Sequence, residues 1–228
     1  MPARLLAALF AAPLAALSLQ CAATPFVVRV GLERVVMDLP AGFADTVDLA
    51  SPRLQDLAAT LTSASNRVLA FGVTDADYRR FTNGEFLDFK RYVVAVTPKG
   101  LERNRVTPEQ FNALVTDSLQ QFGKPADAPD LVKFLEKQPI GRVNLLAELR
   151  KEPTVVSVLQ GTRLPPLTGR VFEDNKPQYV VFSTTIFLAA GKALQLAVYS
   201  MHDNPADAEW VRYTTLRWIE ELLRLNPR

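Results

Sequence analysis

The hydrophobic positions along the chain follow two periods, and each change of period marks a predicted element. Two β-branched runs, 26–30 and 34–39, are separated by Gly31-Leu32-Glu33 and predict a hairpin. Pro40 and Gly42 then end the strand pattern, because proline cannot donate to a ladder and glycine permits a turn. Further β-branched runs predict strands at 68–73, 92–96 and 155–159.

Helical periodicity appears in several segments between these strands. Ser51-Pro52 predicts a helix start with the hydroxyl as cap, and this helix ends near Asn66. Thr107-Pro108-Glu109-Gln110 is a capping-box start for a second helix that Gly123 closes. Asn204-Pro205 predicts the start of a long last helix. Residues 130–137 and 143–150 predict two shorter helices, whereas the polar residues 75–84 predict a loop.

The longest apolar stretch, Tyr179 to Met201, has two interpretations. A hydropathy window alone favours a membrane span, but Gly191-Lys192 lies near its centre. A lysine in mid-bilayer costs about 2.5–3.5 kcal/mol. Two strands around an Ala190-Gly191-Lys192 turn avoid that cost, so we predict a hairpin.

The order of these elements predicts the fold class. Hairpins joined by short loops favour an antiparallel sheet, and the helices between them pack on it. We therefore expect an α+β protein with a mostly antiparallel sheet. Residues 24–228 form one domain in this interpretation, because neither an internal repeat nor a low-complexity linker marks a boundary.

The first 23 residues differ from the rest of the chain. Arg4 precedes an uncharged run from Leu5 to Leu19, and small residues follow at Ala22 and Ala23. This is the pattern of a secretory signal peptide, here with cleavage expected after Ala23. The apolar run is shorter than the roughly 20 residues that a spanning helix needs.

Two alternatives for the leader remain open. The first is an N-terminal anchor that stays attached. The second is lipoprotein processing at Cys21, although Ser18 and Gln20 stand where such sites carry leucine and a small residue.

Composition narrows the function classes further. Cys21 is the single cysteine, so a cleaved chain is thiol-free, which suits a bacterial periplasm. The formal net charge is only +2, which argues against nucleic acid as a partner. No cofactor is expected, because neither the dinucleotide nor the P-loop glycine pattern occurs.

Two places offer candidate chemistry. His202, with Asp203 beside it and Asp207 one turn later, allows an acid–base or metal role. A single imidazole makes a poor zinc site, because zinc prefers three or four protein ligands. The alternative is that Asp203 caps the last helix. The predicted loop after residue 74 has guanidinium groups that could bind an anion; the alternative is that it is a solvated connector. The segment does not match a calcium-binding loop, because Arg79 and Phe86 occupy positions where that loop has oxygen ligands. The candidate ligand-binding residues are Asp75, Asp77, Tyr78, Arg79, Arg80 and His202, and none is assigned to catalysis or to a metal.

A resemblance to a known family follows from three features. Leu39 to Phe43 is a Leu-Pro-x-Gly-aromatic turn, Gly191 to Leu194 is a Gly-Lys-x-Leu turn, and the last helix carries Trp210 and Trp218. On these features the chain resembles the PsbP-like and DcrB-type exported α/β sandwich proteins. The resemblance implies an antiparallel sheet between helices in a small exported accessory protein, and it carries over no functional residue.

These observations predict an exported, non-enzymatic binding or accessory protein of the bacterial cell envelope. Its expected partner is an envelope protein or a small anionic ligand, and the mature chain is expected to lack a membrane span. The alternatives are a hydrolase that uses carboxylates with His202 and a structural envelope protein tethered to the membrane.

Overall fold

The computed structural model describes residues 24–47, 51–120, 123–165 and 177–227, so the predicted leader, 1–23, lies outside the described residues. The strands are β1 (Phe26–Val30), β2 (Glu33–Met37), β3 (Phe43–Asp45), β4 (Asn66–Thr74), β5 (Arg91–Pro98), β6 (Asn144–Glu152), β7 (Val155–Leu164), β8 (Gln178–Ala189) and β9 (Lys192–Met201). The helices are α1 (Pro52–Leu61), α2 (Asp75–Thr82), α3 (Pro108–Gln120), α4 (Leu131–Glu136) and α5 (Ala206–Leu225).

Seven of the strands form one sheet in the order β3-β4-β5-β9-β8-β7-β6, and every neighbouring pair is antiparallel. β1 and β2 form a separate two-stranded hairpin. The predicted α+β single domain with a mostly antiparallel sheet is therefore confirmed.

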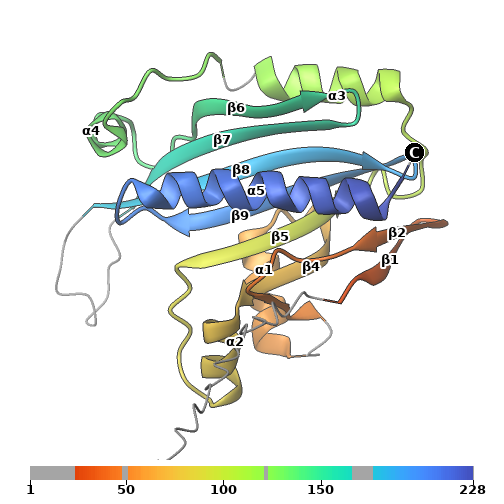
Figure 1. The fold of residues 1–228 in the computed structure, drawn as a ribbon, viewed down its shortest axis with the longest axis horizontal. Coiled ribbons are helices and arrows are strands. Elements are labelled where there is room, and N and C mark those ends of the chain that lie inside the picture. Colours follow the sequence, from red (N-terminus) through yellow and green to blue (C-terminus); the bar gives the residue numbers. More distant parts are fainter. Residues whose placement is uncertain (1–23, 48–50, 121–122, 166–176, 228) are drawn as a thin grey trace, which may run out of the picture.

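Helices lie on both faces of the large sheet. α5 lies over β8 and β9, with its axis roughly along the strands (Figure 1), and its Val211, Trp218 and Ile219 share a buried core with Leu196 and Val198 of β9. The β1–β2 hairpin joins the same core through residues that include Met37. On the opposite face, α1 and α3 cover separate parts of the sheet through two smaller cores.

The long apolar stretch near the C-terminus is the predicted hairpin, β8–β9. Its two-residue turn has positive φ at both Ala190 (50°) and Gly191 (72°), as a type I′ turn requires. None of the helices in the described ranges is both long and apolar enough to cross a membrane.

Two predicted elements are wrong. The helix predicted at residues 143–150 is wrong, because Asn144–Glu152 form strand β6. Two irregularities in its pairing with β7 break the strict alternation that would mark a strand in the sequence. Residues 75–82 form α2 instead of a loop. Its Asp77 is buried, and its remaining side chains are at least partly exposed, so no apolar stripe marks the helix in the sequence.

The predicted helix caps have mixed outcomes. At α3 the capping box is present: Thr107 Oγ1 accepts from the N–H of Gln110, and Gln110 Oε1 accepts from the N–H of Thr107. Ser51 makes no side-chain capping bond to α1. At α5, the carboxylate of Asp207 accepts from the N–H groups of Asp203 and Asn204, and Asn204 Oδ1 accepts from the N–H of Ala206.

Candidate functional site

The five predicted ligand-binding residues after Thr74 do not converge on one point. Because they lie on a helix, Asp77 points inward and is buried, Tyr78 packs against the core under α1, and the remaining three are exposed. Those three are Asp75, Arg79 and Arg80. No ion pair links either arginine to another of the described residues.

Asp77 holds the chain on both sides of α2. Thr74 Oγ1 accepts from the N–H of Asp77 and donates to its carboxylate, which closes the first turn of the helix. The other carboxylate oxygen accepts from the N–H of Asp88 at 2.7 Å and from that of Phe89 at 3.5 Å. Asp77 therefore fixes residues 83–90, which we call the α2–β5 segment, against α2.

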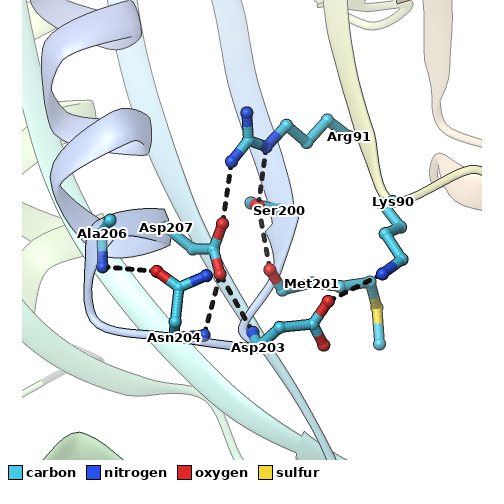
Figure 2. A network of polar contacts seen from close by, with 8 residues as sticks. All are labelled: Lys90, Arg91, Ser200, Met201, Asp203, Asn204, Ala206 and Asp207. Atoms are coloured by element: carbon cyan, nitrogen blue, oxygen red, sulfur yellow. Dashed lines mark hydrogen bonds and ion pairs between the residues drawn. The ribbon is translucent and has the colours of Figure 1, made fainter.

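Lys90, the last residue of this segment, and Arg91, the first of β5, connect it to the predicted His202 region. Lys90 forms an ion pair with Asp203 at 2.9 Å, and Arg91 forms one with Asp207 at 2.8 Å (Figure 2). Together with His202, these four residues form what we call the junction network. The network joins the start of β5 to the end of β9 and the start of α5.

Asp207 is the best-connected carboxylate of the junction network. One oxygen accepts from Arg91, and the other accepts from the N–H groups of Asp203 and Asn204 (Figure 2). Burial alone raises the pKa of Asp207, but the hydrogen bond from Arg91 and the backbone bonds outweigh it and hold that pKa below its usual range. Asp207 is therefore ionised and fully bonded, which leaves it unsuited to accept a substrate proton.

Arg91 is held on three sides. Besides Asp207, its Nε lies 3.4 Å from Ser200 Oγ, and its guanidinium carbon lies 4.2 Å from the ring centroid of Trp210. A guanidinium stacked on an indole and paired with a carboxylate is rigid and poorly available to another anion.

His202 is buried, with 8% of its surface exposed. Its backbone N–H donates to Tyr179, but its side-chain Nδ1 has no hydrogen-bond partner in the part of the chain that the structure describes. Burial lowers the pKa of His202, and the nearby carboxylates of Asp207 and Asp203 oppose this effect only in part. The neutral imidazole is therefore the favoured form.

The chemistry open to the junction network follows from these contacts. Two carboxylates lie close to His202, as an acid–base site needs, but each is bonded to a cation. Within the described ranges, no three His, Cys, Asp or Glu side chains gather closely enough to hold a metal ion. These contacts show a clamp that holds the start of α5 on the sheet.

The sequence indicated His202, Asp203 and Asp207, but not Lys90 or Arg91. These cations lie more than 110 residues from their partners, and each has an ordinary sequence context. Only the pairing of β5 with β9 brings them together.

A shallow groove of about 470 Å³ lies elsewhere, between α3 and the β6–β7 turn. Its floor includes Val115, Leu119 and Val156, and its rim includes Lys151 and Glu152. None of the sequence-predicted ligand residues lines it.

Comparisons with known proteins add a fold likeness. No family model matches the chain. No curated protein matches it either. Among solved structures, the Ran-binding protein Mog1p of Saccharomyces cerevisiae is similar, with 12% identity, a TM-score of 0.40, and coverage of 89% of this chain and 94% of that one. A structure of a Mog1 point mutant matches with the same values.

The resemblance to PsbP-like and DcrB-type proteins is therefore wrong as an identification. No family model supports it, and two solved structures that are similar to this chain are those of Mog1. The residues on which it rested serve packing here: Leu39, Phe43 and Trp218 are all buried in the main core. Turn and core residues of this kind recur in unrelated proteins and carry little family information.

Proposed function

We propose that the chain is an exported accessory protein of the bacterial cell envelope that binds a partner protein through the end of α2 and the α2–β5 segment. The observation that carries this proposal is Phe86. Its side chain is 83% exposed, although a phenyl ring of this size is normally covered. An exposed aromatic ring on a well-held segment is typical of the anchor residue of an interface.

The segment that carries Phe86 is held at several points. Asp77 bonds two of its N–H groups, and the ring of Phe89 stacks on Tyr92 with centroids 4.6 Å apart. Lys90 continues the anchoring through Asp203. Because the segment is ordered before binding, little conformational entropy remains to be lost when a partner docks.

The chemistry around Phe86 indicates the kind of partner. The guanidinium of Arg53 lies 5.7 Å from the centre of the ring, and Arg80 accepts a backbone bond from Glu85, directly before Phe86. Arginine and aromatic residues dominate the binding energy of many interfaces. The partner we propose offers an apolar pocket for the ring and carboxylates for Arg79 and Arg80.

Export of the chain rests on the sequence of residues 1–23. We propose cleavage after Ala23, with acylation of Cys21 as the alternative. The intact mass of the exported chain tests this step. A mass without residues 1–23 and without lipid supports ordinary cleavage, whereas an added lipid or a full-length mass rejects it.

The docking surface is tested with a photo-crosslinking amino acid at position 86 and, as a control, at Tyr213, which is 66% exposed on α5. We expect one protein to be captured from position 86 and not from position 213, and capture to fall in an Arg79→Ala/Arg80→Ala variant. With that protein purified, Phe86→Ala raises the Kd about tenfold or more. Equal capture from both positions, or a Kd that Phe86→Ala leaves unchanged, contradicts the proposal.

A further inference from the structure

The turn of the β1–β2 hairpin is surrounded by arginines from three parts of the chain, and its end projects from the body of the molecule (Figure 1). Arg67 of β4 donates to the backbone carbonyl of Arg29, and Arg105 lies 3.7 Å from Glu33. The turn also touches the backbone at Glu102, directly before Arg103. We call this region the hairpin-tip surface; it comprises Leu32, Arg29, Arg34, Arg67, Arg103 and Arg105.

Leu32 forms the apolar end of the hairpin-tip surface, with 99% of its side chain exposed. It occupies a two-residue turn whose first position is Gly31, at φ +60°. Behind the turn, Lys192 Nζ donates to the carbonyl groups of Glu102 and Asn104. A lone exposed leucine needs no explanation by itself. This leucine, however, lies on a turn that packs against the backbone of Glu102, which the buried Lys192 holds in place.

The charges around Leu32 are unbalanced. Arg29 and Arg34 are exposed and lie directly opposite each other across the two strands, an arrangement of like charges that is destabilising. Two glutamates pair with Arg67 and Arg105. No ion pair within the described ranges reaches Arg29, Arg34 or Arg103, so the surface carries an excess of positive charge that an anionic partner would neutralise.

We propose that the hairpin-tip surface docks on an anionic lipid surface, with Leu32 inserted at the level of the headgroups and the arginines on the lipid phosphates. A projecting apolar side chain inside a ring of cations fits the boundary of a bilayer, where phosphates lie above hydrocarbon. A protein partner would instead favour a broad, closely packed contact. This binding is peripheral, and it does not depend on the docking surface at Phe86.

An environment-sensitive fluorophore at position 32, in a Cys21→Ser background, reads insertion directly, whatever else in the chain touches the vesicle. The matched position is 86, because Phe86 is the next most exposed large hydrophobic residue among those that the structure describes. With vesicles that contain phosphatidylglycerol, we expect a blue shift at position 32 only. Vesicles of phosphatidylcholine alone give none, and salt reverses the shift because it screens surface charges.

A charge-matched pair of variants completes the test. Arg29→Gln/Arg34→Gln weakens vesicle binding at position 32 by about tenfold or more, since each basic residue near an anionic surface contributes to attraction. Lys137→Gln/Arg142→Gln removes the same charge at two exposed residues elsewhere and leaves the binding unchanged. Equal losses from both pairs, a shift at position 86 as large as at 32, or a shift with neutral vesicles overturns the proposal. Binding of a soluble acidic protein without any vesicle-dependent shift overturns it as well.

Discussion

Asp207 shows how one carboxylate of the junction network joins three segments. Its two oxygens receive the guanidinium of Arg91 and two backbone N–H groups ahead of α5 (Figure 2). The neighbouring pair, Lys90 with Asp203, has the same chemistry but stands in solvent, with 57% and 58% of the side chains exposed. The two ion pairs therefore have the same charges and differ in how far their side chains are buried.

We expect Asp207→Ala to lower the free energy of unfolding by about 3 kcal/mol, because it leaves Arg91 and two N–H groups without their acceptor. The matched control, Lys90→Ala/Asp203→Ala, costs less than about 1 kcal/mol, since water solvates both ions well. Urea denaturation of the three proteins measures both values. Comparable losses from the two substitutions would contradict the role given to burial.

Burial also determines the charge state of His202. Burial holds the pKa of His202 below 6.5, its ordinary value, so the unfolded chain binds a proton first as the pH falls. The free energy of unfolding is therefore at its full value above pH 6.5 and declines below it, by about 1.4 kcal/mol for each unit by which the pKa is lowered.

The test compares urea denaturation from about pH 5.5 to 7.5 in wild type and His202→Gln, and the variant is expected to flatten the pH dependence. Because the chain has one histidine, its imidazole NMR signals need no assignment. A titration midpoint at or above 6.5 in the folded protein would show that burial does not dominate.

At the scale of the element, the β1–β2 hairpin depends on one close approach. A Cβ on Gly31 would lie 2.3 Å from the carbonyl oxygen of Glu102, which the chain cannot accommodate without movement. Gly42 has a similar positive φ, +86°, but a Cβ there meets no atom within 4 Å. The two glycines share a backbone conformation and differ in their surroundings.

We expect Gly42→Ala to cost about 1–2 kcal/mol, the strain of a left-handed conformation in a residue with a side chain. Gly31→Ala is expected to cost clearly more, because it adds a steric clash to the same strain. Thermal or urea unfolding of the two variants measures the difference. Equal costs would mean that the 101–104 turn moves away freely.

Across the whole molecule, Trp218 of α5 and Asn226, directly after that helix, hold the first hairpin in place. The side chain of Asn226 bonds both the N–H and the carbonyl of Val36, and Trp218 Nε1 donates to the carbonyl of Asp38 at 2.7 Å. These contacts join positions about 180 to 190 residues apart. The position of the hairpin on the sheet therefore depends on contacts with the C-terminal part of the chain.

Asn226→Ala is expected to lower the free energy of unfolding by about 1–2 kcal/mol, because it leaves polar groups of Val36 without partners. Amide exchange at Val36 rises at the same time. Asn112→Ala, on the exposed side of α3, serves as the control and changes neither quantity. Unchanged protection of Val36 in the Asn226 variant would show that the core alone holds the hairpin.

Elements whose cause is local could be predicted from the amino-acid sequence. The turn residues of the two hairpins and the capping box at Thr107 act within a few residues of each other, so their patterns predicted the structure correctly. The apolar stripe of the last helix did the same, and together these elements were enough for the α+β class. Helix α2 and strand β6 were not predicted. A mostly exposed helix such as α2 has no apolar stripe, and two irregularities hide the two-residue period of β6.

The positions of charged groups and of exposed apolar groups depend on the packing of the whole chain. This packing turned Asp77 into an internal anchor, paired Arg91 with Asp207, and left Phe86 and Leu32 in solvent. The near-zero net charge gave no sign of the arginines around the hairpin tip, because a sum over the chain contains no positions. Electrostatic and packing interactions depend on distance in space, and the sheet sets those distances between residues that are remote in sequence.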